Sequence, residues 1–347
     1  MRRFLVFADL AQIIVRVRST ARFAFATGLG LLVLATAPQA AFGTVNLAQN
    51  AGAEAGQSGG GSIAAIPSWN TTSLFSVNNY GNGDGPTVAV GQQAAGGSNY
   101  FWGGPNNALS TATQTIDVSG YASAIDTGRA PLLFGVFLGR KQGQRDHMDV
   151  KLETLDSSGT RHALISAFGG SPNTPATKTS VNPIAGSVTT PKGTRTLRLT
   201  MTATRLDGNN NDAYADNLVV IVGDPSPSTI GTIARSLALK MLVAMPTAQA
   251  ANVLGKLSPK VALRILAFVP ADGAGPVDGA RIVARLSPKV ALKILSAGPV
   301  DGAKILARLP LNVGLKILKS ASRSTKAKLV GQLSKSKAAP YRRKLSI

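Results

Sequence analysis

The sequence predicts a multidomain protein in which an all-β sandwich is followed by an all-α domain of short repeated helices. Three observations predict this fold class. Hydrophobic residues alternate with a period of two up to about residue 222, and further along the period becomes helical and segments recur almost unchanged. The charge changes at the same place. Residues 44–224 hold 11 basic and 12 acidic side chains, giving −1, whereas residues 225–347 hold 21 basic and 3 acidic ones, giving +18.

The first 43 residues have the features of an export signal. Arginines precede the apolar run FAFATGLGLLVLATA, which is shorter than the roughly 20 residues of a membrane-spanning helix. Ala41-Phe42-Gly43 supplies a small-x-small cleavage pattern. We therefore expect a signal peptide over residues 1–43 and a bacterial protein that is secreted, periplasmic or associated with the cell envelope. Retention of the segment as a membrane anchor is the alternative.

Residues 44–222 show the pattern of short strands separated by turn residues. In TRTLRLTMTATR, residues 197, 199, 201 and 203 are apolar and share one face, as in a half-buried strand. DVKLETLDSSGT predicts a strand that ends in a turn, and PLLFGVFLG and NLVVIV are apolar on both faces. The chain has no cysteine, so an exported form must be stabilised by its core, a bound ion or both.

Several segments of this region resemble a known family of sandwiches. NLAQNAGAEAG, NYFWGGPNNALSTATQTIDVSGYASAIDTG and DAYADNLVV are similar to the galactose-binding-like, carbohydrate-binding-module type of jelly roll, over about residues 45–222. The resemblance implies that the first and last strands lie side by side. It also implies a structural Ca²⁺ held by a Glu after the first strand and an Asp before the last, which here are Glu54 and Asp216. The alternative is that Glu54 caps a turn and Asp216 forms an Asx-turn.

A carbohydrate site combines aromatic rings, on which sugar rings stack, with amide and acid groups for the hydroxyls. The candidates are Trp102, Tyr80, Tyr100 and Asn106. Burial in the core is the commoner role for each aromatic residue. Phe101 and Trp102 are consecutive, so in a strand they face opposite ways.

Catalysis is not expected. The chain has two histidines, and it contains no nucleophile elbow, HExxH sequence or phosphate-binding loop. His147 lies between acids in RKQGQRDHMDV, but a charged loop entering a strand explains this segment better than a metal or acid–base cluster.

The segment GDPSPST, residues 223–229, is the expected linker to a helical repeat domain over residues 230–320. GPVDGARIVARLSPKVALKILSA recurs as GPVDGAKILARLPLNVGLKILKSA, and prolines recur where the helices should begin. Ser258-Pro259 and Ser287-Pro288 predict N-cap and N1 pairs. VPADGA breaks the spacing and predicts a loop insertion. Residues 321–347 are expected to form a basic tail with one short helical stretch.

The repeat over about residues 240–320 weakly resembles the short-helix repeats of magnesium-transporter N-terminal domains and flagellar motor switch domains. Only the superhelical architecture is carried over, because those repeats are typically acidic. Basic side chains recur here at repeat spacing: Lys260, Arg264, Lys289, Lys293, Lys304, Arg308, Lys316 and Lys319. They predict contact with an anionic envelope polymer or lipid surface, the alternative being a solvated face. No motif for sequence-specific recognition of nucleic acid is present.

These features predict an exported, non-catalytic binding or adhesion protein whose sandwich binds a glycan and a structural calcium ion. One alternative is an envelope-associated structural or protein–protein interaction protein without a carbohydrate ligand. A more distant one is an accessory module of a hydrolase.

Overall fold

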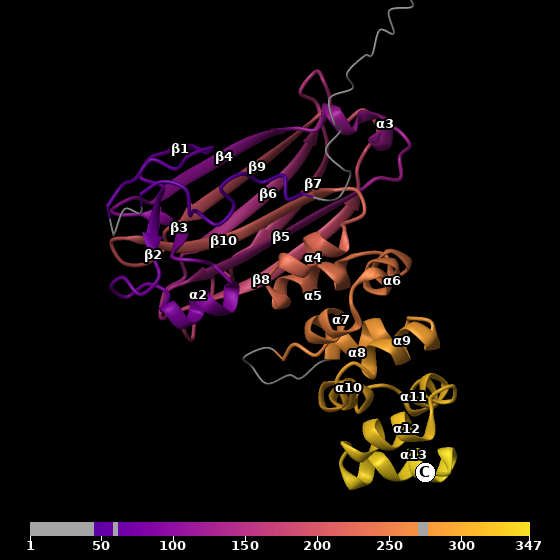
Figure 1. Cartoon of the computed structure of the whole chain (residues 1–347). Helices are drawn as coiled ribbons and strands as arrows, with labels where there is room; N and C mark the ends of the chain where they lie inside the picture. The colour runs from indigo at the N-terminus through magenta and orange to yellow at the C-terminus, as the bar shows by residue number, and fades with distance from the viewer. Residues whose placement is uncertain (1–44, 58–61, 270–276) are drawn as a thin grey trace, which may run out of the picture. The chain divides into compact units, whose positions relative to one another are not determined.

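Two antiparallel sheets form the N-terminal part of the chain (Figure 1). The computed structural model describes residues 45–57, 62–269 and 277–347, so the expected signal peptide and most of the VPADGA insertion lie outside the described residues. In spatial order, sheet A consists of β1 (Asn70–Thr72), β4 (Leu109–Asp117), β9 (Thr196–Thr204), β6 (His147–Leu155) and β7 (Arg161–Phe168). Sheet B consists of β2 (Ser76–Asn79), β3 (Asn99–Gly104), β10 (Asn211–Val222), β5 (Pro131–Arg140) and β8 (Ser180–Thr189).

The two sheets enclose an apolar core. Leu197, Leu199 and Met201 of β9 are fully buried there, whereas the alternate residue Arg198 is exposed, which confirms the predicted period-two strand. Phe101 also belongs to this core. The core therefore uses one face of each sheet, as expected of a sandwich.

The chain enters the sandwich alongside its last strand. The backbone N–H of Leu47 donates to the carbonyl of Val220 at 2.8 Å, and the N–H of Leu218 donates to the carbonyl of Ala51 at 3.0 Å. The first segment and the last strand are therefore adjacent, as the resemblance to jelly rolls implies.

A bulge in β10 changes which residues face outward. The register with β5 shifts between Asp216 and Val219, and Asn217 has a φ of 46°. Before the bulge, Asp212, Tyr214 and Asp216 point away from the sandwich core, and after it Val219 does. The bulge therefore separates a polar and aromatic part of the outer face from an apolar part.

Short helices make up the rest of the chain. α2 (Val88–Ala94), η1 (Ser119–Tyr121) and α3 (Ala122–Ile125) lie in loops of the sandwich. The C-terminal part contains α4 (Pro227–Thr232), α5 (Arg235–Ala244), α6 (Thr247–Lys256), α7 (Pro259–Leu266), α8 (Val277–Val283), α9 (Pro288–Leu295), α10 (Pro299–Leu306), α11 (Leu311–Leu318), α12 (Arg323–Gly331) and α13 (Lys335–Leu345). The predicted fold class, a sandwich followed by short helices, is confirmed. Among the described helices, none is long and apolar enough to cross a membrane.

The helix starts follow the predicted capping chemistry. The Ser258 and Ser287 hydroxyls accept the N–H groups of Val261 and Val290, with a proline at the first position of each helix. The first N–H groups of a helix have no partner within the helix. In these two 8-residue helices, the serine hydroxyl pairs one of them.

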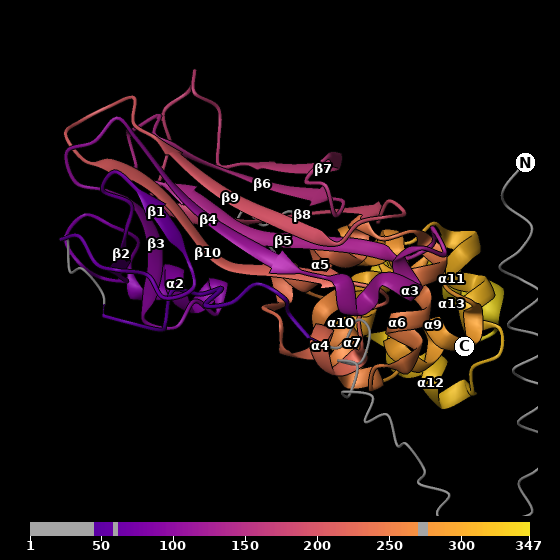
Figure 2. The ribbon, with the colours of Figure 1, turned by 90° about the horizontal axis from the view of Figure 1, so that it is seen from above.

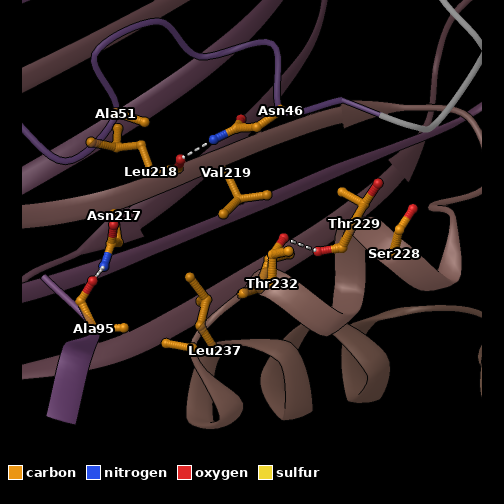
Figure 3. A pocket seen from close by; sticks show the side chains of 12 residues that line it. Asn46, Ala51, Ala95, Asn217, Leu218, Val219, Ser228, Thr229, Thr232 and Leu237 are labelled. Atoms are coloured by element: carbon orange, nitrogen blue, oxygen red, sulfur yellow. Dashed lines mark hydrogen bonds between the residues drawn. The ribbon is translucent and has the colours of Figure 1, made fainter. Parts of the chain in front are cut away.

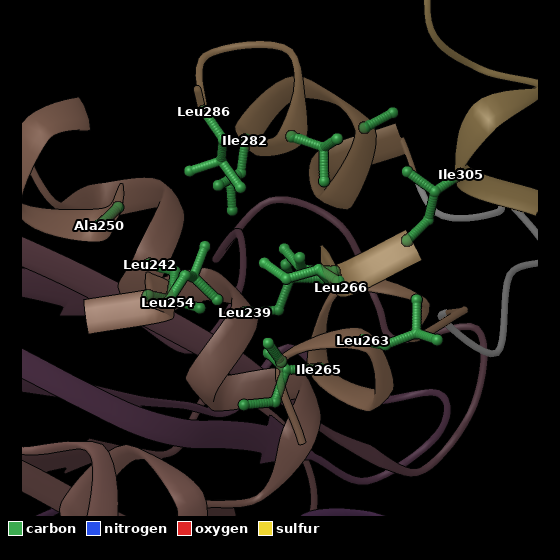
Figure 4. Packing of buried hydrophobic residues seen from close by; sticks show 14 of the residues in the cluster. Leu239, Leu242, Ala250, Leu254, Leu263, Ile265, Leu266, Ile282, Leu286 and Ile305 are labelled. Atoms are coloured by element: carbon green, nitrogen blue, oxygen red, sulfur yellow. The ribbon is translucent and has the colours of Figure 1, made fainter. Parts of the chain in front are cut away.

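The helical part packs directly on sheet B. Leu133, Phe137 and Val219 of the sheet share one apolar cluster with Leu237 and Met241 of α5. Figures 1 and 2 both show α5 against β5 and β8, and Figure 4 shows how residues of successive helices continue the same cluster. This contact explains why PLLFGVFLG and NLVVIV are apolar on both faces.

Two expectations about the ends of the helical domain are wrong. The linker expected over residues 223–229 is shorter, because α4 begins at Pro227. The basic tail expected over residues 321–347 is instead α12 and α13, and its residues Leu329, Val330 and Tyr341 are buried in the helical core. The many Lys and Arg residues of this segment obscured, in the sequence pattern, an apolar stripe that packs on the preceding helices.

Candidate functional site

An aromatic cluster covers the polar part of the outer face of sheet B. Tyr80, Tyr100, Trp102 and Tyr214 pack together, with the Tyr100 ring centre 5.0 Å from that of Tyr80 and 5.2 Å from that of Tyr214. Trp102 and Tyr214 face each other in the register of β3 and β10. Tyr100, Trp102 and Tyr214 form the floor of a surface pocket.

The pocket, which we call the sheet B pocket, has a volume of about 330 Å³, which is at the small end of the range for ligand sites. Three surfaces line it: strands β2, β3 and β10, the Gly-rich loop after β2, and the segment after β5. Its lining residues are Asn78, Asn82, Gly83, Asp84, Gly85, Tyr100, Trp102, Lys141, Asn210, Asp212 and Tyr214.

Charged groups converge in the sheet B pocket. The Lys141 ammonium lies 2.9 Å from Asp84 Oδ2 and 4.0 Å from Asp212 Oδ2. Trp102 Nε1 donates to Asp212 Oδ1 at 3.4 Å. Burial raises the pKa of Asp212, and the nearby Lys141 opposes this shift. Asp84 lies on the loop with its side chain 82% exposed, so the pocket combines one buried and one exposed carboxylate.

Asp146 fixes the hairpin that carries Asp212. Its fully buried carboxylate accepts the backbone N–H groups of Leu206, Asp207 and Asp212 at 2.7–2.9 Å. Asp207 is held on the same hairpin by Arg145, at 2.7 Å between Arg145 Nη2 and Asp207 Oδ1. The walls of the sheet B pocket near Asp212 are therefore preorganised.

The predicted stacking platform is wrong. Trp102, Tyr80 and Tyr100 are 3%, 7% and 0% exposed, so none presents an open ring face. They are buried because the Gly-rich loop after β2 and α2 lie over them; a Cβ on Gly91 of α2 would lie 2.7 Å from the Tyr80 ring. Trp102 and Tyr100 still line the pocket, whereas Tyr80 does not. Asn106 lies outside it too, in the exposed turn after β3.

One pocket hydroxyl is left without a well-formed hydrogen bond. Tyr100 Oη is buried and has no hydrogen-bond partner among the described residues. Burial raises the pKa of Tyr100, and the nearby Asn78 amide partly opposes the shift. A buried polar group in this condition favours a ligand or water that completes its hydrogen bonding.

Glu54 and Asp216 are brought together, although they are far apart in the sequence. Glu54 Oε1 accepts the backbone N–H groups of Ser98 and Asn99 at 3.0 and 2.8 Å. Asp216 is fully buried, and its carboxylate accepts the Tyr80 hydroxyl and the N–H of Asn217, both at 2.6 Å. The Gly96-Gly97 segment lies against both acids. A Cβ on Gly96 would overlap Asp216 Oδ2, and one on Gly97 would lie 2.6 Å from Glu54 Cδ.

The two acids fit a cation that prefers oxygen ligands. Burial raises the pKa of Asp216 well above its usual range, the Tyr80 hydroxyl opposes this, and Glu54 raises it further. In the described part of the chain, none of the ion pairs includes either carboxylate. A buried carboxylate beside a second acid is costly without a positive partner. No group of three or more acidic, His or Cys ligands occurs among the described residues, so other ligands would be backbone oxygens and water.

A second hollow lies where β10 meets α4 and α5 (Figure 3). Its asparagines already bind the backbone. Asn46 Nδ2 donates to the carbonyl of Leu218 at 2.7 Å, and Asn217 Nδ2 donates to those of Ala94 and Ala95 at 2.6 and 2.8 Å. These asparagines hold the bulge and the chain entry in place, and their amide nitrogens already donate to backbone carbonyls.

All eight of the predicted anion-contacting side chains are exposed: Lys260, Arg264, Lys289, Lys293, Lys304, Arg308, Lys316 and Lys319. Lys304 forms an ion pair with Asp301 at 2.8 Å. In the described helical region the other ion pairs join Asp278 to Lys240 and Arg281. The strong positive charge is thus displayed at the surface.

Sequence reasoning missed Asp84, Lys141 and Asp212 as neighbours. The available signal for Asp84 was the Asn/Gly-rich composition of VNNYGNGDGP, which is typical of a loop. Asp207 pairs with Arg145, and Asp212 faces Lys141 and Trp102.

The solved structures that are similar to this chain have low sequence identity to it. No family model and no curated protein sequence matches the chain. The solved structure of TmCBM61 in complex with β-1,4-galactotriose is 12% identical over 51% of this chain and 99% of that chain, with a TM-score of 0.29. The CBM22-1 xylan-binding domain of Xyn10C from Paenibacillus barcinonensis is 12% identical over 53% of this chain and 98% of that chain, with a TM-score of 0.28.

A third similar structure is the enzymatically active domain of tailspike protein 4 from bacteriophage CBA120. It is 16% identical over 51% of this chain, with a TM-score of 0.32. The chain spans only 21% of that tailspike domain. The first two structures are carbohydrate-binding modules, the type of sandwich that the motifs in residues 45–222 resemble.

Proposed function

We propose that the protein is a non-catalytic glycan-binding protein and that the sheet B pocket is its carbohydrate site. The observation that carries this proposal is the convergence of Asp84, Lys141 and Asp212 above an aromatic floor. Planar carboxylates and an ammonium group can each bind adjacent sugar hydroxyls, and Trp102 and Tyr214 offer apolar edges to the ring carbons. The volume suits one terminal sugar or a short segment of a chain.

The same groups argue against hydrolysis. A glycosidase needs its two carboxyl groups free to act on the glycosidic oxygen and on water or the sugar carbon. Here the Lys141 ammonium lies within 4.0 Å of both Asp84 and Asp212, so neither carboxylate is free of a charged partner. We therefore expect binding without the release of new reducing ends.

A glycan array with full-length protein tests the proposal. Asp84→Ala and Lys141→Met should each weaken the best array signal about tenfold or more, because hydrogen bonds to charged groups contribute roughly 1.5–3 kcal/mol. Asn106→Ala, in the exposed turn outside the pocket, is the control and should leave the signal unchanged. If no glycan binds, the envelope-associated interaction protein without a carbohydrate ligand becomes the better proposal.

We also propose that Glu54 and Asp216 hold a structural Ca²⁺, with remaining ligands from backbone carbonyls and water. When bound, the ion would supply the positive charge that the buried Asp216 lacks. It would also tie the chain entry at Glu54 to the last strand, which would restrict local opening of the sandwich.

The helical region is proposed to attach the protein to an anionic surface of a bacterial envelope. The supporting observation is the display of eight exposed basic residues on a region with a charge of +18. Such attachment would hold the sheet B pocket near envelope or extracellular glycans, in keeping with the expected export signal.

Binding of full-length protein to heparin and to anionic vesicles tests this attachment. Full-length protein is needed because α5 shares a core with sheet B. A variant with Lys289, Lys293, Lys316 and Lys319 changed to Gln should elute at lower salt. The matched control changes four exposed bases of the sandwich: Arg129, Lys151, Lys178 and Lys192. Equal losses in both variants would show a general charge effect and contradict a dedicated surface.

A further inference from the structure

A third pocket lies within the helical region, away from the sandwich. We call it the α5–α8 pocket, and its volume is about 340 Å³, within the range of small-molecule sites. Residues at the end of α5, the start of α6 and α8 line it: Leu242, Val243, Met245, Thr247, Ala250, Arg281, Ile282 and Arg285.

The floor of the α5–α8 pocket is apolar. Leu242, Met245, Ala250 and Ile282 are between 1% and 8% exposed and come from different helices or their ends. Figure 4 shows Leu242, Ala250 and Ile282 on separate helical segments around this part of the cluster. Val243 stands at the rim and is 43% exposed. The pocket therefore offers an apolar interior that a sugar would not match.

The mouth of the pocket is positively charged. Arg285 Nη1 donates to Thr247 Oγ1 at 3.2 Å, which fixes one guanidinium across the opening. Arg281 has a side chain that is 73% exposed and lies 3.7 Å from Asp278, whose other oxygen binds Lys240 at 3.0 Å. Arg281 and Lys240 thus share the carboxylate of Asp278, whereas none of the ion pairs in the described helical region includes Arg285. α6 also begins here without a side-chain cap, which adds the positive end of its dipole.

We propose that the α5–α8 pocket binds a linear alkyl carboxylate, with the alkyl chain on the apolar floor and the carboxylate between Arg281 and Arg285. Guanidinium groups match carboxylates in geometry as well as in charge. An alkylammonium ion would meet the same floor but would be repelled at the mouth. This inference does not depend on glycan binding, because none of its residues lines the sheet B pocket.

Titration calorimetry of the full-length protein with monomeric hexanoate, octanoate and decanoate tests the proposal. One site per chain is expected, with affinity rising about fourfold for each buried methylene group until the pocket is filled. The double variant Arg281→Gln/Arg285→Gln should bind decanoate at least tenfold more weakly. A decyl ammonium salt should not bind at the site.

Variants of an exposed residue separate loss of the site from loss of the fold. Val243→Glu should weaken decanoate binding, whereas Val243→Lys should not; Val300→Glu, an exposed valine of α10, is the matched control. The proposal fails if wild-type protein does not bind decanoate, if affinity is independent of chain length, or if the double arginine variant binds equally well. Binding to anionic vesicles without binding of decanoate would also overturn it, since that result needs only surface charge.

Discussion

Replacing Asp216 with Asn should remove a calcium-dependent part of the protein's stability. The change keeps the size of the side chain and an oxygen for the Tyr80 hydroxyl, but it removes the buried negative charge. At a calcium concentration 100 times Kd, binding to the folded state alone raises the free energy of unfolding by about 2.7 kcal/mol. Glu54→Gln should lose most of the same increment, because it removes the other carboxylate.

The size of the thermal shift follows from the shared core. Because sheet B and α5 belong to one apolar cluster, we expect the sandwich and the adjoining helices to unfold in a single transition. A cooperative unit of this size shifts by roughly 2 °C per kcal/mol, so calcium should raise Tm by about 5 °C relative to chelator. Scanning calorimetry with and without chelator measures this directly.

The pH dependence gives a second readout of the same site. In chelator, the folded pKa of Asp216 is raised, mainly by burial, so the folded state holds a proton that the unfolded state has released. The contribution of Asp216 to stability should then be fully present below the unfolded pKa of about 3.9 and be lost as pH rises through the folded pKa, by at most about 1.4 kcal/mol per pH unit. Saturating calcium should reduce this slope, and Asp216→Asn should remove it.

One control variant and two possible results test whether Glu54 and Asp216 bind calcium. Asp117→Asn changes an exposed acid that accepts the Ser119 N–H, and it should retain the full calcium increment. Identical melting curves with calcium and with chelator would refute the reasoning. Retention of the increment in Asp216→Asn would show that any bound ion lies elsewhere.

Three further predictions follow from the packing. Gly96→Ala should lower Tm and abolish the calcium increment, because its Cβ would overlap Asp216 Oδ2; melting curves of Gly120→Ala, where a Cβ meets no neighbour, provide the comparison. Leu237→Ala should destabilise the protein by about 2–5 kcal/mol and lower the sandwich and helical transitions together, measured by near- and far-UV circular dichroism; separate transitions would contradict the shared core. Ser287→Ala should cost about 1 kcal/mol in chemical denaturation, and an unchanged midpoint would show that the cap is unimportant.

Strands and helices were predictable where they depend on residues close together in the sequence. The period-two pattern of β9 and the Ser-Pro pairs of α7 and α9 depend on neighbours in the sequence, and both are found as expected. PLLFGVFLG is apolar on both faces, and an apolar outer face must be covered by another element to be shielded from water. Which element supplies that cover could not be read from the pattern, because α5 and β5 are joined only by tertiary packing.

The candidate sites were less predictable for the same reason. Glu54 and Asp216 were paired through a resemblance, and the fold does bring them together. Of the predicted aromatic residues, Trp102 and Tyr100 line a pocket, but all three are buried because the loop after β2 and α2 cover them. Asp84, Lys141 and Asp212 lie on three separate segments, so no spacing in the sequence reveals their convergence.

Fluorescence of Trp102 during a glycan titration tests the central claim most directly. Trp102 lines the sheet B pocket, whereas Trp69 lies in the core between the sheets, so a Trp69→Phe background isolates the signal from the pocket. Using the best ligand from the array, we predict a saturable change in Trp102 emission, with Kd raised at least tenfold by Asp84→Ala and unchanged by Asn106→Ala. A glycan that binds without changing Trp102 emission, with equal affinity for both variants, would contradict binding in the sheet B pocket.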